Sequence, residues 1–258
     1  MKILFIGASK FGLRCLKAIY QLSEVSIVGV ISNRENFNIS YSKEGVSNVL
    51  YTDFELFTSE LKIPFYRMER NMSEQNLVDF VKIVNPDYGI VVGWYHLIPK
   101  LLLNQFPFGG LHASLLPDYS GGAPLVWAMI NGEKFTGISF FLFDEGVDSG
   151  AIISQKRVEI NENDTIATLY QKIEELGIEI LLEQIPKLAN GSAILTIQDG
   201  SKRRVFPQRK PEDGLINWDW DSTRIKNFIR AQTKPYPGAF TILNNKKVII
   251  WDADIFDV

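Results

Sequence analysis

An alternation of short apolar runs with segments of helical periodicity constrains the fold more than any other feature of this 258-residue sequence. KILFIGAS (2–9) is an apolar run, FGLRCLKAIYQL (11–22) has apolar residues at helical spacing, and VSIVGVIS (25–32) is a second run rich in Val and Ile. A strand, a helix and a strand in this order open a parallel sheet. We therefore predict an α/β fold with an open, mostly parallel, Rossmann-like sheet and flanking helices.

The alternation continues towards residue 200. Buried strands are predicted at DYGIVVGWY (87–95), FGGLH (108–112) and FTGISFFLFD (135–144). AIISQKRVEI (151–160) alternates apolar with charged residues, which is typical of an exposed or edge strand. The most periodic helix of the chain follows at 164–191, with Asp164 or Thr165 as its cap.

The character of the sequence changes near residue 196. DGSKRRVFPQRKPEDG (199–214) is polar and rich in turn residues, as expected of a linker. PYPGAFTILNNKKVIIWDADI (235–255) contains two β-rich runs around an Asn-Asn turn, which predicts a hairpin. We predict two domains: a large α/β domain at 1–200, and a helix plus a small β-rich appendage at 201–258.

Composition excludes several classes of protein. The net charge is −3, and the one dense basic cluster is KRR at 202–204, so a nucleic-acid surface is not indicated. Cys15 is the single cysteine, which rules out an internal disulfide and a multi-cysteine zinc site, and it is expected to fill a buried helix face. The apolar start is too short for a signal peptide, and no run is long enough to span a membrane. We expect a cytoplasmic protein with no membrane partner.

The segment GASKFG (7–12) invites comparison with phosphate-binding loops. It matches neither G-x-G-x-x-G nor the P-loop pattern. A tight strand-to-helix turn, in which Gly7 and Gly12 permit close backbone approach, is the preferred interpretation. Anion binding at the helix N-terminus stays open as an alternative.

Different roles are expected for the two histidines. His96, in GWYHLIP (93–99), is expected to be a hydrogen-bonded structural residue, beside Trp94 and Tyr95 at the carboxyl edge of the sheet, where open α/β folds bind ligands. His112 ends a strand at the same edge, and Asp148 lies in the turn-rich EGVDSG (145–150). A histidine oriented by a carboxylate would form a general base. The residues alone leave open a core histidine and an unrelated surface carboxylate.

The stretch LHASLLPDYSGGAPLVWAMINGEKFTGISFFLFDEGVDSGAI (111–152) strongly resembles the folate-dependent formyltransferases. That family has H-x-S-L-L-P, a Gly-rich turn, T-G and D-x-G in this order. IRAQTKPYPGAF (229–240) further resembles the start of the C-terminal β-barrel domain of its tRNA and sugar enzymes, which implies a truncated, OB-like appendage here.

The resemblance implies an enzyme that moves the formyl group of 10-formyltetrahydrofolate to an amine, without a metal. His112 and Asp148 fall on the family's catalytic histidine and aspartate, with the histidine taking the amine proton. The cofactor-binding residues implied are Gly93, Trp94, Tyr95, Ser114, Leu115, Leu116, Pro117, Asp144, Glu145, Gly146, Val147 and Asp148.

Gly110 departs from the family pattern. The family usually places an asparagine there, two residues before the histidine, as a donor to the formyl oxygen. Loss of such a donor typically costs about two to three powers of ten in rate. Backbone N–H groups of FGGLH (108–112) or a water would have to replace it. Two other functions stay open: hydrolysis of 10-formyltetrahydrofolate, and a folate-binding relative without catalysis.

For the acceptor, a nucleotide-linked amino sugar is expected first. Methionyl-tRNA as the acceptor is disfavoured, because 32–50 is mixed in charge, the appendage is short, and DYSGG (118–122) replaces basic residues. Glycinamide ribonucleotide is disfavoured because its enzymes lack the PYPGAF segment. Tyr119 and Trp127 are candidates to stack on a base or line the acceptor cleft, although helical spacing favours a core position for Trp127. An exposed edge of KKVIIW (246–251) would allow a homodimer.

Overall fold

The computed structural model describes residues 1–39 and 42–256. The chain divides into two compact units: the first comprises residues 1–112, 140–154 and 177–197, and the second comprises residues 113–139, 155–176 and 198–258. This division interleaves the chain, and the expected domain boundary at residue 200 stays a prediction.

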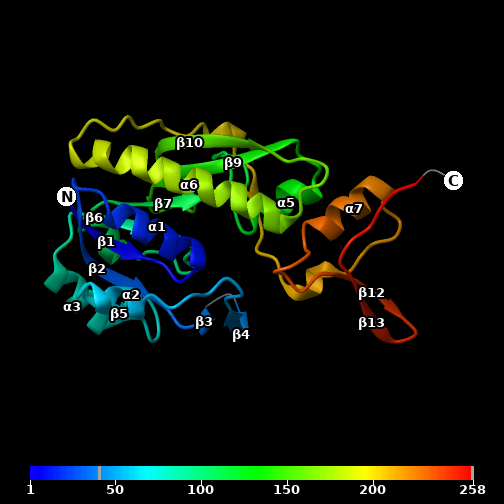
Figure 1. The fold of residues 1–258 in the computed structure, drawn as a ribbon, viewed down its shortest axis with the longest axis horizontal. Coiled ribbons are helices and arrows are strands. Elements are labelled where there is room, and N and C mark those ends of the chain that lie inside the picture. The colour runs from blue at the N-terminus through cyan, green and yellow to red at the C-terminus, as the bar shows by residue number, and fades with distance from the viewer. Residues whose placement is uncertain (40–41, 257–258) are drawn as a thin grey trace. The chain divides into compact units, whose positions relative to one another are not determined.

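The first unit contains most of the sheet and its helices (Figure 1). Its elements are β1 (Lys2–Ile6), α1 (Lys10–Tyr20), β2 (Ser26–Ser32), β3 (Asn36–Ile39), β4 (Ser42–Ser47), α2 (Glu55–Glu60), β5 (Phe65–Arg67), α3 (Gln75–Val84), β6 (Tyr88–Val91), α4 (Lys100–Leu103) and β7 (Phe108–His112). Three further elements have residues in both units: β9 (Phe135–Leu142), β10 (Ile152–Glu159) and α6 (Ile166–Ala189).

Within the described residues, seven strands form one sheet in the order β10-β9-β7-β6-β1-β2-β5. The pairs β1–β2, β1–β6, β2–β5 and β6–β7 are parallel. Residues 3–6 of β1 are fully buried, as expected of a central strand covered on both faces. The α/β fold with a mostly parallel sheet is confirmed, and β10 lies at the sheet edge, as its charge pattern predicts.

The turn between β1 and α1 is built on close backbone contact. A Cβ placed on Gly7 would lie 2.6 Å from the carbonyl oxygen of Val92, and one on Gly12 would lie 2.9 Å from it. Ser9 caps α1 by accepting the backbone N–H of Gly12 at 3.0 Å. Cys15 is buried on the inner face of the helix. The preferred interpretation of GASKFG as a tight packing turn is confirmed.

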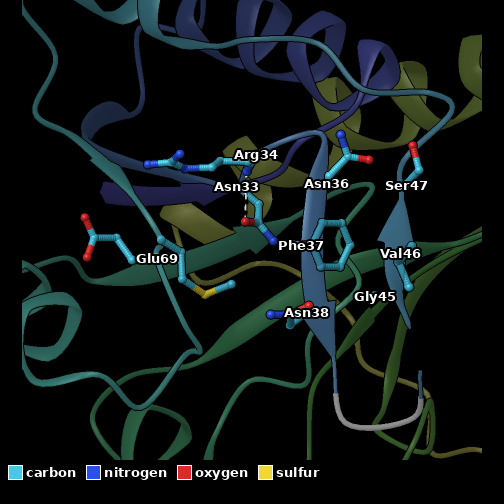
Figure 2. A pocket seen from close by; sticks show the side chains of 10 residues that line it. Asn33, Arg34, Asn36, Phe37, Asn38, Gly45, Val46, Ser47 and Glu69 are labelled. Carbon is cyan, nitrogen blue, oxygen red and sulfur yellow. Dashed lines mark hydrogen bonds between the residues drawn. The ribbon is translucent and has the colours of Figure 1, made fainter. Parts of the chain in front are cut away.

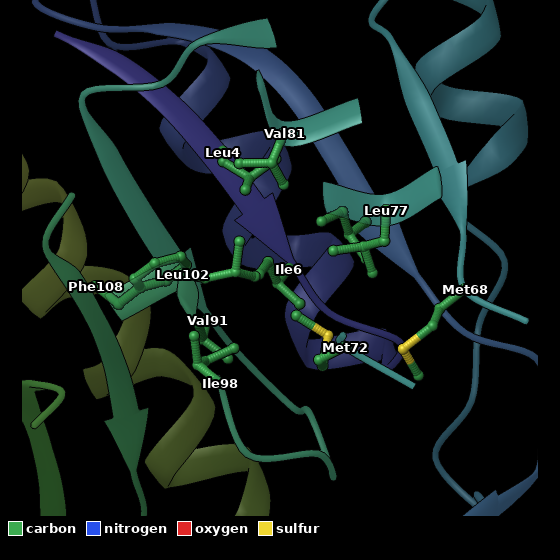
Figure 3. Packing of buried hydrophobic residues seen from close by; sticks show 11 residues of the cluster. Leu4, Ile6, Met68, Met72, Leu77, Val81, Val91, Ile98, Leu102 and Phe108 are labelled. Atoms are coloured by element: carbon green, nitrogen blue, oxygen red, sulfur yellow. The ribbon is translucent and has the colours of Figure 1, made fainter. Parts of the chain in front are cut away.

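The core of the first unit lies between β1 and α3 (Figure 3). Leu4 and Ile6 of β1 meet Leu77 and Val81 of α3, and all four side chains are at most 1% exposed. Burying a side chain of this size stabilises the fold by about 1.5–3 kcal/mol. This core fixes the strands whose ends carry the candidate site.

The second unit contains shorter elements. They are β8 (Ser120–Gly121), α5 (Pro124–Ile130), η1 (Gly200–Lys202), β11 (Val205–Phe206), η2 (Pro211–Gly214), α7 (Ser222–Arg230), β12 (Ala239–Leu243) and β13 (Lys246–Ile250). Strands β12 and β13 form the expected antiparallel hairpin. Asn244 and Asn245 both have positive φ, at 49° and 57°, which is the backbone that a two-residue hairpin turn needs.

The segment 199–214 is not a free linker, which corrects the expectation from its composition. β11 pairs with β8, and Ser120 donates its backbone N–H to the carbonyl of Arg204 at 3.0 Å. Gly122 donates to the carbonyl of Phe206 at 2.8 Å. Of the helices the structure describes, none is both long and apolar enough to cross a membrane.

Candidate active site at the carboxyl edge of the sheet

The candidate site starts where β6 and β7 end. The two strands are parallel neighbours, so their carboxyl ends lie at one edge of the sheet. His112 is the last residue of β7, and residues 92–96 follow β6. Ligands of open α/β sheets bind at this edge. The expected positions of both histidines relative to the strand ends are therefore confirmed.

His112 and Asp148 lie together within the first unit. The Nδ1 of His112 is 3.7 Å from Oδ2 of Asp148, and the two side chains are 11% and 19% exposed. This separation is longer than a hydrogen bond but within the range of an ion pair with a protonated ring. Phe141 meets the ring edge-on, with centroids 6.5 Å apart. Nδ1 is thus the ring nitrogen that faces the carboxylate.

The loop that carries Asp148 has a defined shape. Oδ1 of Asp144 accepts the backbone N–H of Gly146 at 2.9 Å and the hydroxyl of Ser149 at 2.8 Å. A Cβ on Gly150 would collide with the carbonyl oxygen of Leu142, so the return of the loop requires glycine. Asp148 itself has φ +53°, a left-handed backbone that is uncommon for residues other than glycine. The loop thus holds Asp148 in an unusual conformation facing His112.

Gly110 lies in a space that admits no side chain. A Cβ built there would be 2.6 Å from Cζ of Phe143 and 2.7 Å from the carbonyl oxygen of Val91. The phenyl ring has some freedom to move, but the sheet carbonyl of Val91 does not. The phenyl ring of Phe143 therefore occupies the place where an asparagine side chain would begin.

The segment after β6 contributes further predicted cofactor-binding residues. Gly93 has φ +63°, and a Cβ there would collide with the hydroxyl of Ser9, so glycine is required. The indole Nε1 of Trp94 is buried and has no hydrogen-bond partner among the described residues. The hydroxyl of Tyr95 is 3.4 Å from Oδ1 of Asn48.

His96 is a hydrogen-bonded residue, as expected. Nδ2 of Asn33 lies 3.1 Å from Nε2 of His96, while Oδ1 of Asn33 accepts the backbone N–H of Arg34 at 2.8 Å. The amide oxygen is thereby committed to the backbone, so Nδ2 donates to the ring. Burial lowers the pKa of His96, which favours the neutral ring that this acceptor role requires.

Exposed apolar side chains occur in the Asp148 loop and in the segment from Leu97 to α4. Leu97 is 75% exposed, Leu101 54% and Val147 44%. Lys100 and Glu145 form an ion pair at 2.6 Å, which ties α4 to the loop. An apolar surface of this kind next to loop peptide groups suits a flat, partly apolar ring system.

The remaining predicted cofactor-binding residues, Ser114–Pro117, belong to the second unit. Ser114 and Leu116 are 1% and 3% exposed. Ser139 donates its hydroxyl to the carbonyl of Ser114 at 2.6 Å, and Gln155 donates to the carbonyl of Leu116 at 2.9 Å. These contacts hold the shape of the turn, and its part in cofactor binding stays a prediction.

The two aromatic residues considered for the acceptor are already engaged within the second unit. The ring of Tyr119 stacks on Phe206 with centroids 4.5 Å apart, and the guanidinium of Arg204 lies 4.8 Å from the Tyr119 centroid. Trp127 is half-buried and donates its indole N–H to the carbonyl of Pro207 at 2.9 Å. Tyr119 is 6% exposed and its ring is stacked on Phe206, so the ring is not available to stack on a base.

No sequence motif indicates the cavity at the end of β2, where strands β3 and β4 form a hairpin (Figure 2). The cavity has a volume of about 350 Å³. Its lining includes Asn33, Arg34, Asn36, Phe37, Asn38 and Glu69. Among the residues that the structure describes, no group of three or more His, Cys, Asp or Glu could hold a metal ion.

Comparison with known proteins identifies the family. Residues 1–185 match the model described as "Formyl transferase", and residues 209–257 match "Formyl transferase, C-terminal domain". The chain is 34% identical to the methionyl-tRNA formyltransferase of Thermodesulfovibrio yellowstonii, over 99% of this chain and 80% of that protein.

Two solved structures have the same fold. A sugar N-formyltransferase from Shewanella sp FDAARGOS_354 superposes with a TM-score of 0.76 at 18% identity, covering 100% of this chain and 99% of that chain. WlaRD, a sugar 3N-formyl transferase determined in the presence of dTDP and 5-N-formyl-THF, gives a TM-score of 0.69 at 22% identity, covering 96% and 85%. The chain belongs to the formyl transferase family, the family that its own sequence motifs resemble.

Proposed function

We propose that this chain transfers the formyl group of 10-formyltetrahydrofolate to the amine of a nucleotide-linked amino sugar, with His112 as general base and Asp148 as its partner. The observation that carries the proposal is the 3.7 Å approach of these two side chains at the carboxyl edge of the sheet. A histidine and a carboxylate in this arrangement suit a reaction in which a nucleophile loses a proton.

The residues around the pair fit a folate. A pterin is flat, with amide-like donors and acceptors along one edge. The exposed loop 144–148 offers peptide groups, and Leu97 and Val147 offer apolar surface. The predicted contacts at Gly93–Tyr95, in the same unit, add to the residues that would hold it. When bound, this folate supplies the formyl carbon as an electrophile and takes up a proton on its leaving nitrogen.

The chain's own residues have three tasks. Nε2 of His112 accepts the proton that the attacking amine loses. Asp148 orients the ring through Nδ1 and stabilises the imidazolium that forms. A hydrogen-bond donor must also face the formyl oxygen as negative charge develops there. Gly110 supplies no side chain for this, so we assign the donor role to a backbone N–H or an ordered water.

Charge supports a small acceptor over tRNA. The one dense basic cluster, 202–204, is largely neutralised within the second unit. Arg204 makes two contacts of 2.6 Å with Asp118 and one of 3.1 Å with Glu133. Lys202 lies 3.4 Å from Asp199. A polyanion such as tRNA draws its affinity from cations that are available to its phosphates.

Methionyl-tRNA is the second candidate acceptor. The curated relatives favour it, because several methionyl-tRNA formyltransferases are 30–34% identical to nearly the whole chain. The sugar enzymes share less sequence but superpose well. The lack of a side-chain donor at Gly110 keeps hydrolysis of the folate as a third candidate.

One assay separates these activities. The protein is incubated with 10-formyltetrahydrofolate and, separately, with nucleotide-linked amino sugars, methionyl-tRNA or no acceptor. The proposal predicts that tetrahydrofolate release and N-formyl product both depend on an amino sugar. Release only with methionyl-tRNA supports the tRNA enzyme, release without acceptor supports a hydrolase, and no release with any acceptor supports a binding protein; each of these three results contradicts the proposal.

A further inference from the structure

The cavity at the end of β2 is built from four segments of the first unit (Figure 2). Asn33 and Arg34 follow β2, residues 36–38 lie on β3, residues 45–47 lie on β4, and Met68 and Glu69 follow β5. The volume of about 350 Å³ is in the range of ligand pockets. The β2 and β5 ends place the cavity at the same sheet edge as His112.

The lining has the chemistry of a site for a neutral, polar ring. Asn36 and Asn38 bring carboxamides, which offer both donors and acceptors, whereas the carboxamide of Asn33 is engaged with Arg34 and His96. Arg34 and Glu69 bring opposite charges that cancel. Phe37 contributes an aromatic surface. A nucleobase and its ribose match such a lining, whereas a run of phosphates does not.

The cavity wall is fixed to the candidate active site. The Phe37 ring centroid is 5.3 Å from that of Tyr95 and 5.2 Å from that of His96. Asn33 donates to His96 at 3.1 Å. Tyr95 and His96 belong to the segment after β6, which also carries Gly93 and Trp94. The cavity and the predicted folate contacts therefore share one wall.

Sheet geometry sets how far the cavity lies from the reaction centre. Strand β2 is separated from β7 by β1 and β6, which makes three strand intervals. At about 4.8 Å each, the end of β2 lies roughly 14 Å from the end of β7, where His112 is found. In a nucleoside diphosphate sugar, the diphosphate link separates the base from the sugar amine by a comparable span.

We propose that this cavity binds the nucleoside end of the acceptor while the amino sugar reaches His112. The identification of that ligand as the acceptor rests on the proposed function. The cavity's affinity for a nucleoside diphosphate does not depend on catalysis and is measured without folate.

Titration calorimetry of the intact protein with UDP, dTDP, GDP, CDP and ADP tests the proposal. At least one of them should bind, and replacing both carboxamides in Asn36→Ala/Asn38→Ala should weaken that binding about tenfold. Asn104→Ala, at an exposed asparagine after α4, is the matched control and should leave the Kd within twofold. A lack of binding by all five nucleotides overturns the proposal, and so does an equal Kd in the double variant and the control.

A second variant distinguishes a loss of nucleotide binding at the cavity from a general loss of stability. Ser47 is exposed and lines the cavity, so the indole of Ser47→Trp would fill it from the surface. Loss of nucleotide binding with an unchanged unfolding midpoint supports the site. Unchanged binding in this variant counts against it.

Comparison with the formyl-transfer assay separates the two proposals. If an amino-sugar nucleotide is formylated but its KM is unchanged in Asn36→Ala/Asn38→Ala, the cavity assignment fails alone. If nucleotide binding depends on Asn36 and Asn38 but no formyl transfer occurs, the proposed function fails alone. If both hold, the double variant raises the KM for the acceptor about tenfold without a matching rise in the KM for folate.

Discussion

The ring of Phe143 lies where a side chain at Gly110 would begin, 2.6 Å from the position of a Cβ built on that glycine. The carbonyl oxygen of Val91 is 2.7 Å from the same point. The space at position 110 is therefore filled by neighbouring atoms. We expect that a single substitution at this position does not supply a side-chain donor.

Gly110→Ala should destabilise the protein. The added methyl group meets the sheet carbonyl of Val91, which cannot move without disturbing the pairing of β6 with β7. Overpacking of this kind costs about 1–3 kcal/mol in the free energy of unfolding. Denaturant unfolding of the variant and the wild-type protein measures this difference in the free energy of unfolding. Gly200→Ala is the control, because a Cβ at Gly200 has nothing within 4 Å; equal stability of the two variants would show that the space at position 110 is wrongly described.

Gly110→Asn should lower formyl transfer. The amide cannot reach the formyl oxygen in its usual direction while Phe143 fills the space, and the strained strand displaces His112 two residues later. Steady-state rates with a saturating acceptor test this. A variant faster than the wild-type protein would mean that a side-chain donor fits at position 110 and was limiting.

Asp144→Ala should weaken folate binding. It removes the two hydrogen bonds, to Gly146 and Ser149, that shape the predicted pterin-binding loop. Their combined loss corresponds to about 1–3 kcal/mol, so the KM for 10-formyltetrahydrofolate should rise roughly tenfold. Asp79→Ala, on the exposed face of α3, serves as the control. An unchanged KM for folate in Asp144→Ala would remove the loop from the folate site.

Asp164 should stabilise the protein in a pH-dependent way. Burial alone would raise its pKa, but the ammonium of Lys172 at 2.6 Å, the backbone N–H of Asn161 and the hydroxyl of Thr168 outweigh burial and lower the pKa. A lowered pKa stabilises the fold above the unfolded value of about 3.9, and the effect is lost as pH falls through the folded value.

Asp164→Asn should therefore cost about 1.5–3 kcal/mol between pH 5 and 8, with a difference from the wild-type protein that shrinks below about pH 4. Measuring the free energy of unfolding of the variant and of the wild-type protein across this pH range tests the prediction. The exposed Asp219→Asn should show no such profile. If the loss of unfolding free energy in Asp164→Asn did not vary with pH, the charge of Asp164 would not contribute to stability.

The parts of the fold that sequence could predict are those with strong local signals. The apolar runs of β1 and β2, the glycines at 7 and 12 and the Asn-Asn turn each dictate local backbone geometry, and the structure agrees with all of them. The pairing of His112 with Asp148 is implied by the resemblance to the formyltransferases, whereas the residues alone leave a core histidine and an unrelated carboxylate open.

The parts that sequence could not predict depend on partners distant in the chain. β11 has two residues and no periodicity, and it becomes a strand because Ser120 and Gly122 bond to it from 84 residues away or more. Phe143 gives no local sign that it replaces a side chain at Gly110. The cavity lined by Asn33 and Phe37 arises from a short hairpin whose polar sequence resembles a loop.

The most direct test of the account is a double-mutant cycle on His112 and Asp148, with kcat/KM for formyl transfer as the readout. Each single variant, His112→Ala and Asp148→Ala, should lose about a hundred- to ten-thousandfold in rate while retaining the wild-type unfolding midpoint. If the two side chains act as one unit, the double variant will be about as slow as the slower single variant. Losses that multiply in the double variant, or near-normal turnover in either single variant, would contradict the account.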